Sequence, residues 1–193
     1  MVYINDCLDK LDLDTALPLL PDERRQKALA FKHELGRRQS VAVWMLLRQG
    51  CREVFGLEDV PSVAYGEHGK PYFPEHPDMH FNMSHCRHAV ACVVSRQPVG
   101  IDIESLRKFD TRLVRYVLND EEYKVYTESE QPDLTFTQFW TRKESLLKLT
   151  GHGLTTDLKS VLTTHPDVLL NTVVHPEQRY VYSVARYALP DSE

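Results

Sequence analysis

The sequence predicts an α+β fold made of two related lobes. In each half of the chain, segments with helical patterns are followed by short segments with strand patterns. Residues 99–105, VGIDIES, alternate apolar and polar side chains with the period of two that is typical of a strand with one buried face. Residues 135–150 instead carry an apolar stripe at helical spacing. We expect an N-terminal lobe over residues 1–98 and a C-terminal lobe over residues 99–193.

Two helices are predicted in the first half, after an apolar opening that we expect to form a short strand. Pro21 is followed by two acidic residues, which is a typical helix start. Arg24, Lys27 and Phe31 follow at spacings of three and four, so this helix has a basic face with an aromatic end. The second helix is predicted over residues 39–55, where apolar side chains recur at helical spacing.

Strands are predicted to complete the first half. Runs rich in apolar and β-branched residues cover 60–65, 79–84 and 89–95. The first two are separated by GEHGKP at residues 66–71, where glycine and proline indicate a turn.

The second half begins with the strand over 99–105. The basic segment that follows, residues 106–115, is expected to start a helix, and Asn119 with its three following acidic residues predicts another helix start. The helix over 135–150 is expected to end at Gly151. Short strands are predicted beyond it at residues 161–162, 168–170, 172–174 and 181–187.

Composition limits the classes of function. The chain has 193 residues, 42% hydrophobic and 26% charged, which is ordinary for a soluble globular protein. The net charge of −5 argues against a general nucleic-acid-binding protein, which needs a basic surface. The sequence has no signal-peptide pattern and no apolar run that could span a bilayer, so we expect no membrane association. The four cysteines form no C-x-x-C pair and no evident disulfide framework, which favours the cytoplasm.

Two carboxylates on the strand over 99–105 are the first candidate ligands. Asp102 and Glu104 are two residues apart, so they point to the same side of the strand. Their mutual repulsion would be relieved by a cation between them, and oxygen ligands suit Mg²⁺. Gly100, just upstream, would let a ligand approach the backbone closely. The alternative is a solvated acidic face on an edge strand.

The helix over 135–150 supplies a third carboxylate. Trp140, Glu144 and Lys148 are four residues apart and therefore lie along one side of the helix. Glu144 and Lys148 could form an ordinary surface salt bridge. Alternatively, Glu144 faces Asp102 and Glu104 as a third metal ligand, with Lys148 one turn away as a point charge for a phosphate.

Further polar candidates lie upstream. Lys70 stands beside a proline in the turn at 66–71, and a predicted strand ends with Ser84 and His85. His85, a second nearby histidine and two cysteines do not have the spacing of a structural zinc site. Ser84 and His85 also lack the G-x-S-x-G elbow of a hydrolase.

Taken in order, these motifs resemble a known family. They are GKP at 69–71, FN-x-SH at 81–85, GIDIE at 100–104, W-x-x-K-E-S-x-x-K at 140–148 and G-x-G-L at 151–154. The chain resembles the 4'-phosphopantetheinyl transferases, in particular the Sfp-type group, from about Pro21 to Leu154. The resemblance implies two pseudo-symmetric α/β lobes in one chain, for which a monomer is sufficient.

The resemblance also implies a reaction. Coenzyme A would bind between the lobes, with its pyrophosphate on a Mg²⁺ held by Asp102, Glu104 and Glu144. The serine hydroxyl of an apo acyl or peptidyl carrier protein would attack the phosphorus that bears the pantetheine arm, releasing 3',5'-ADP. Glu144, or a metal-bound water beside it, would be the general base.

The family pattern extends to the contacts with coenzyme A. Lys148 and His85 would stabilise the pyrophosphate oxygens and join Glu144 as catalytic residues. The other implied contacts are Lys70 and Ser84, with Arg24, Lys27 and Ser40 at the 3'-phosphate and adenosine end.

Two other functions fit part of the pattern. A Mg²⁺-dependent hydrolase of coenzyme A or another nucleotide pyrophosphate would use the same carboxylates with water as the nucleophile. A degenerate binding module for coenzyme A or a carrier protein would keep the fold without turnover.

The resemblance implies a carrier protein as partner, and the surface of such carriers is usually acidic. Docking to a chain of net charge −5 therefore needs a local basic patch. The candidates for this patch are Arg107, Lys108, Arg112 and Arg115. The alternative is that these residues form only a solvated basic face of a helix.

Overall fold

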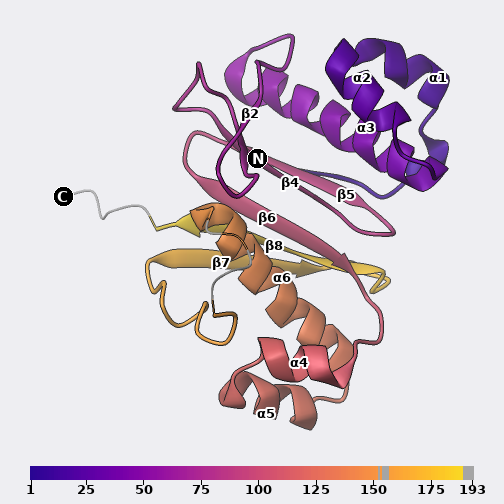
Figure 1. Cartoon of the computed structure of the whole chain (residues 1–193). Coiled ribbons are helices and arrows are strands. Elements are labelled where there is room, and N and C mark those ends of the chain that lie inside the picture. The colour runs from indigo at the N-terminus through magenta and orange to yellow at the C-terminus, as the bar shows by residue number, and fades with distance from the viewer. Residues whose placement is uncertain (152, 154–156, 189–193) are drawn as a thin grey trace.

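The described residues form two three-stranded sheets and a two-stranded hairpin. Figure 1 shows a long helix along one face of each three-stranded sheet, and shorter helices at the two ends of the molecule. The computed structural model describes residues 1–151, 153 and 157–188. Its mixture of helices and antiparallel strands confirms the predicted α+β class. Within these residues, no helix is both long enough and apolar enough to cross a membrane.

The first sheet is formed by three antiparallel strands from the first half of the chain. Their order is β1 (Val2–Asn5), β5 (Val90–Ser95) and β4 (His80–His85). The predicted strands at 79–84 and 89–95 are confirmed within one residue at each end. Since β5 lies in the middle and is buried along its first five residues, it forms the centre of this lobe.

Helix α3 (Glu34–Gly50) covers one face of this sheet and continues into a π-helical turn over Cys51–Phe55. The predicted helix is therefore confirmed, with a start five residues earlier than expected. Val41 and Leu47 of α3 are fully buried and belong to the same apolar core as Val94 of β5. This burial seats the helix on the sheet.

Several short elements surround α3. The segment before it forms η1 (Leu8–Lys10), α1 (Leu13–Ala16), η2 (Leu17–Leu19) and α2 (Asp22–Leu29). The predicted helix start at Pro21 is confirmed, because Pro21 is the N-cap of α2. The predicted strand at 60–65 is largely wrong, since only β2 (Ala64–Tyr65) pairs, with β3 (Pro71–Tyr72) across the turn at 66–70.

The second sheet has the order β6 (Val99–Ser105), β8 (Tyr180–Tyr187) and β7 (Val168–Val174), again antiparallel. β6 begins and ends at the predicted residues. β7 is one strand rather than two, because Asn171 keeps its place in the ladder opposite Val184. The predicted strand at 161–162 is wrong: these residues form a turn, and Val161 is apolar because it is a buried core residue.

The second half of the chain has three helices: α4 (Thr111–Val117), α5 (Asp120–Glu128) and α6 (Pro132–Thr150), of which α6 packs on the second sheet and α5 packs on α6. The basic segment becomes helical only at Thr111, later than expected. Before it, the Leu106 N–H donates to Arg179 O at 3.1 Å and prolongs the sheet. α6 ends as predicted at Gly151, whose φ of 77° is in the left-handed region that glycine tolerates.

The two sheets meet through their inner faces. Apolar side chains of β5 and β6, including Val93 and Ile101, share one buried cluster. At the edge of β6, side chains of β4 take the place of a missing strand. Asn82 Oδ1 accepts from the Ile101 N–H at 3.1 Å, and Ser84 Oγ accepts from the Ile103 N–H at 3.3 Å. This polar seam brings β4 and β6 together.

Helix α6 approaches the outer face of β6 unusually closely at Gly100. A Cβ atom placed on Gly100 would lie 2.0 Å from Ser145 O and 2.5 Å from Leu149 N. Only glycine therefore allows the backbones to come together here. The close approach brings the second half of α6 over the side chains of Asp102 and Glu104.

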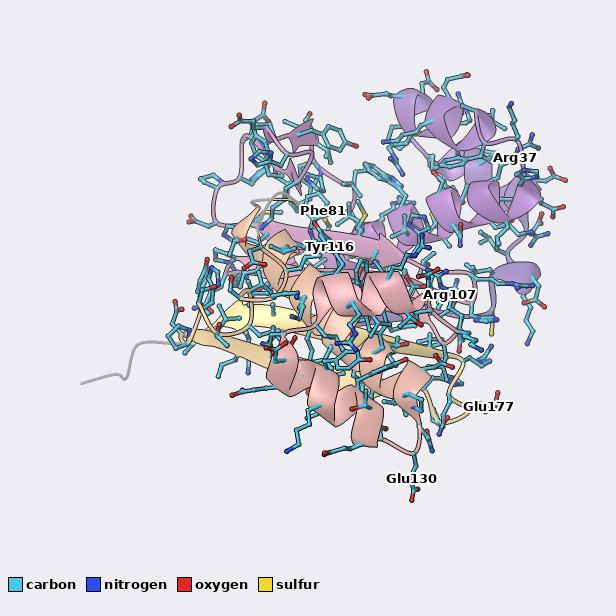
Figure 2. All side chains as sticks on the ribbon, turned by 60° about the horizontal axis from the view of Figure 1, so that its bottom comes forward. Arg37, Phe81, Arg107, Tyr116, Glu130 and Glu177 are labelled. Atoms are coloured by element: carbon cyan, nitrogen blue, oxygen red, sulfur yellow. The ribbon has the colours of Figure 1, made fainter. Side chains whose placement is uncertain are left out.

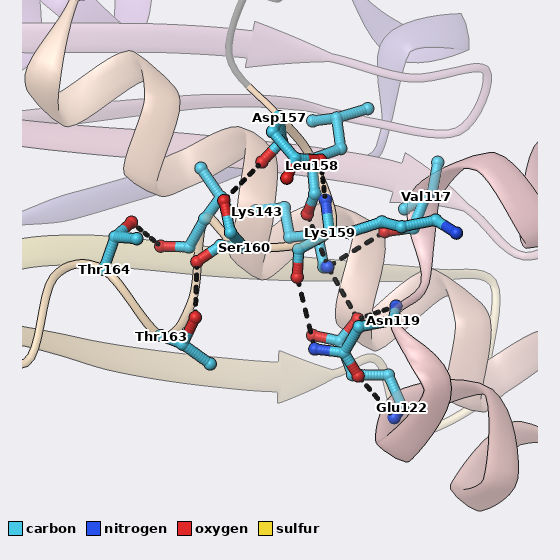
Figure 3. A network of polar contacts seen from close by, with 11 residues as sticks. Val117, Asn119, Glu122, Lys143, Asp157, Leu158, Lys159, Ser160, Thr163 and Thr164 are labelled. Carbon is cyan, nitrogen blue, oxygen red and sulfur yellow. Dashed lines mark hydrogen bonds and ion pairs between the residues drawn. The ribbon is translucent and has the colours of Figure 1, made fainter.

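The rotation of α6 is fixed by a buried lysine. Lys143 is fully buried, and its Nζ donates to Glu122 Oε2 at 2.6 Å, Leu158 O at 2.7 Å and Val117 O at 3.0 Å. Glu122 also closes a capping box with Asn119 at the start of α5. Figure 3 shows how this network ties α5, α6 and the turn around 158 together. Since Glu144 is the next residue, the same contacts orient it.

Candidate active site

Three carboxylates meet between β6 and α6. Asp102 and Glu104 lie on the same side of β6, as predicted, and Glu144 enters from α6. Burial, followed by the charges of Asp102 and Glu104, raises the pKa of Glu144 to about 7, while Lys148 opposes this. Burial also raises the pKa of Glu104, which Arg107 opposes and Asp102 reinforces. The three groups therefore influence one another as members of one site.

Lys148 pairs with Asp102 across the two elements. Its Nζ lies 2.7 Å from Asp102 Oδ1 and 3.0 Å from Ser84 Oγ, and Ser84 donates to the same carboxylate oxygen at 2.9 Å. Within the described residues, Lys148 forms its salt bridge with Asp102 and not with Glu144, so the alternative of a surface pair between Glu144 and Lys148 is wrong. Instead, Glu144 Oε1 is buried and has no hydrogen-bond partner within them.

This donor set suits a divalent cation in charge and chemistry. Oxygen ligands from carboxylates are those that Mg²⁺ takes, and the unpartnered Oε1 of Glu144 is an acceptor that a cation would satisfy. Within residues 1–151, 153 and 157–188, however, no three acidic, histidine or cysteine side chains are grouped closely enough to hold an ion as they stand. The Lys148 ammonium supplies the positive charge beside Asp102 instead.

A cleft of about 230 Å³ opens beside Glu144. Its walls come from the turn before β3, from β4 and from α6. They include His68, Lys70, Asn82, Met83, Glu144 and Lys148. Because three cationic or acidic groups line it, the cleft suits a charged ligand.

Lys70 and His85 are two further predicted residues near the cleft and the Lys148 and Asp102 pair. Lys70 Nζ donates to Leu149 O at 2.7 Å, at the carboxyl end of α6, and burial lowers the pKa of Lys70. His85 ends β4, and its pKa is lowered by partial burial of the ring and then by the charge of Lys148, while Asp102 opposes both. His85 is therefore close enough to feel both members of the Lys148 and Asp102 pair.

A second group of predicted residues lies in the first half of the chain, at α2 and α3. The Arg24 guanidinium stacks 4.6 Å from the centre of the Trp44 ring, and its Nη2 donates to Ser40 O at 3.4 Å. The Nε of Arg24 is buried and has no partner within the described residues. Lys27 Nζ donates to Tyr65 OH at 3.4 Å. Arg24 and Ser40 are thus in contact through the Ser40 backbone.

Sequence patterns missed some residues of both groups. Asn82 lines the cleft and also bonds β6, and its place inside the FN-x-SH motif was the available signal. Tyr65 carried no signal, because only the folded hairpin brings it to Lys27. In the G-x-G-L motif, His152 and Leu154 lie outside the described residues.

Comparisons with known proteins agree with this geometry. The sequence profile of the 4'-phosphopantetheinyl transferase superfamily matches residues 98–188, the part that holds all three carboxylates. A 4'-phosphopantetheinyl transferase of Bacillus subtilis is 32% identical over 164 residues, covering 82% of this chain and 72% of that protein. The Sfp transferase of Bacillus subtilis strain 168 is 28% identical with the same coverage. AcpT of Salmonella typhi is 35% identical over 119 residues, covering 58% of this chain and 61% of AcpT.

Proposed function

Since the chain belongs to the 4'-phosphopantetheinyl transferase superfamily, we propose a division of labour between its two groups of site residues. The enzyme transfers phosphopantetheine from coenzyme A to carrier proteins. In the proposal, residues 1–98 and 99–193 are pseudo-symmetric lobes of a monomer that acts in the cytoplasm, without nucleic acid or membrane. Coenzyme A lies between them.

Asp102, Glu104 and Glu144 would hold Mg²⁺. The observation that carries this assignment is the buried, unpartnered Oε1 of Glu144 beside two further carboxylates. A bound Mg²⁺ neutralises negative charge on the pyrophosphate and orients it for the transfer. Lys148 contacts Asp102 and Ser84. When Mg²⁺ neutralises Asp102 in its place, the Lys148 ammonium would be able to turn toward a phosphate.

The protein's own side chains handle the pyrophosphate and the proton. Lys148 and Lys70 line the cleft, and His85 lies close enough to Lys148 to feel its charge. These three residues would stabilise the pyrophosphate oxygens, with Ser84 beside Lys148. Glu144 would accept the proton of the attacking carrier serine at a carboxylate oxygen. The serine oxygen would form a bond to the phosphorus that bears the pantetheine arm, while the bond from that phosphorus to the bridging pyrophosphate oxygen breaks and releases 3',5'-ADP.

The first-lobe group would hold the other end of coenzyme A. Arg24 and Lys27 are cations close to each other on α2, and Ser40 lies at Arg24. The buried Nε of Arg24 has a hydrogen still to donate, which a phosphate oxygen would accept. This supports a site for the 3'-phosphate and adenosine.

The carrier protein would dock on the basic segment just after β6. Arg107 lies 3.9 Å from Glu104 and stacks on Phe109, and Arg115 stacks 3.6 Å from the centre of the Tyr123 ring. These contacts hold positive charge at the surface next to the carboxylates, and Figure 2 shows Arg107 beside α4. Lys108 and Arg112 extend the patch, which would attract an acidic carrier despite the net charge of −5.

The metal assignment is tested by measuring binding and transfer together. Mn²⁺ binding is followed by paramagnetic resonance for the wild type and for Asp102→Asn and Glu144→Gln, with Glu130→Gln as a control at an exposed position. We expect both site variants to lose metal binding and transfer, and the control to retain both. Transfer that persists in the presence of a chelator would contradict the proposal.

A further inference from the structure

The hairpin of β2 and β3 presents a tyrosine to the two cations of the first lobe. Tyr65 OH accepts from Lys27 Nζ at 3.4 Å, and the same Nζ lies 5.2 Å from the centre of the Tyr65 ring. The Tyr65 side chain also influences Arg24, since it opposes the lowering of the Arg24 pKa that burial causes. Tyr65 therefore contacts Lys27 and lies near Arg24.

Among the described residues, Tyr65 does not belong to any buried apolar cluster. Tyr65 is half exposed, at 50%, and belongs to a strand of only two residues. In that hairpin Tyr65 is opposite Pro71, whereas Tyr72 is opposite Ala64. Because neighbouring residues of a strand point to opposite faces, Tyr65 and Tyr72 lie on different faces of the hairpin. Only Tyr65 faces the cations.

We propose that the Tyr65 hydroxyl is a third contact for the terminal phosphate held by Arg24 and Lys27, and that it makes this enzyme prefer coenzyme A over dephospho-coenzyme A. This inference rests on the proposed function. It adds to that function a residue that discriminates a phosphate monoester from a free hydroxyl.

The chemistry of the three side chains supports this assignment. Lys27 and Arg24 are donors only, whereas a tyrosine hydroxyl can accept from Lys27 and also donate. When a phosphate oxygen takes the hydrogen of Lys27, the Tyr65 hydroxyl can turn and donate to a second oxygen. Its ring keeps the Lys27 ammonium nearby. The unpartnered Nε of Arg24 supplies a third donor direction.

The test compares nucleotides that differ by this phosphate alone. Calorimetric titration with 3',5'-ADP and with 5'-AMP is carried out on the wild type, on Tyr65→Phe and on the control Tyr72→Phe. We expect the wild type to bind 3',5'-ADP more tightly than 5'-AMP. Tyr65→Phe should weaken 3',5'-ADP about tenfold, as expected for one hydrogen bond to a charged group, and leave 5'-AMP unchanged. Tyr72→Phe should change neither.

Kinetics supply the second readout. The KM for coenzyme A should rise in Tyr65→Phe with kcat and the KM for the carrier protein unchanged, and the KM for dephospho-coenzyme A should stay constant. Equal weakening of both nucleotides, or of neither, would overturn the role of Tyr65. A wild type that transfers phosphopantetheine without preferring 3',5'-ADP would also overturn it and leave the proposed function standing. A wild type without any transfer would instead overturn the proposed function.

Discussion

Replacing Glu144 by glutamine should stabilise the metal-free protein, and do so more at pH 8 than at pH 5. In the folded chain the pKa of Glu144 is raised to about 7 by burial and by Asp102 and Glu104, against a usual value of 4.5. Between pH 4.5 and about pH 7, Glu144 is ionised in the unfolded chain but still protonated in the folded chain. Stability present at low pH is therefore lost as the pH rises toward 7.

The size of this effect follows from the shift. A difference of about 2.5 pKa units corresponds to roughly 3 kcal/mol of lost stability at pH 8 and to about 1 kcal/mol at pH 5. Glutamine has the shape of the protonated acid and does not ionise, so Glu144→Gln should recover most of this loss. It should do so while abolishing activity, because the site loses a carboxylate.

Urea unfolding in the presence of EDTA at pH 5 and pH 8 measures the effect. The control Glu130→Gln changes an exposed residue before α6, and its free energy of unfolding should stay within about 0.5 kcal/mol of the wild type at both pH values. If Glu144→Gln gained as much at pH 5 as at pH 8, or lost stability at pH 8, the burial of an ionised Glu144 beside Asp102 and Glu104 would not be the cause.

Other substitutions test the supports of the site. Lys143→Met should lower the free energy of unfolding by about 3 kcal/mol in urea, since it leaves Glu122 buried without its counter-ion; an unchanged midpoint would show that the network is dispensable. Gly100→Ala should lower the free energy of unfolding by roughly 3 kcal/mol and reduce transfer, because its Cβ would collide with Ser145 O. An unchanged melting temperature in calorimetry, together with full activity, would refute the close approach. Reversing Arg112 together with Arg115 to glutamate should raise the KM for the carrier several-fold and spare that for coenzyme A, whereas equal changes in both would exclude the proposed docking patch.

The sequence predicted the carboxylate strand and its helix well, for physical reasons that are local. β6 alternates strictly, so its bounds and the shared direction of Asp102 and Glu104 follow from the period of two. The end of α6 follows from Gly151, which tolerates positive φ. The family was also identified correctly from the order of motifs, since the curated relatives match over 82% of the chain.

What the sequence could not predict depends on distant contacts. Nothing near Lys143 indicates that Leu158, Val117 and Glu122 will surround it, so its complete burial was not foreseen. The contact of Lys148 with a phosphate stays a prediction, whereas its ion pair with Asp102 was not predicted, because only the fold brings α6 onto β6. Apolar residues around Val161 predicted a strand, although the burial of a turn gives the same pattern.

The most direct test of the central claim is the mass of an apo carrier protein after incubation with this enzyme, coenzyme A and Mg²⁺. We expect a gain of one phosphopantetheine on the carrier serine, release of 3',5'-ADP, and loss of both with a chelator or in Glu144→Gln. Cleavage of coenzyme A with an unmodified carrier would favour a hydrolase, and binding of coenzyme A without any reaction would indicate a degenerate module. Either result, found across acyl and peptidyl carriers, would contradict the account.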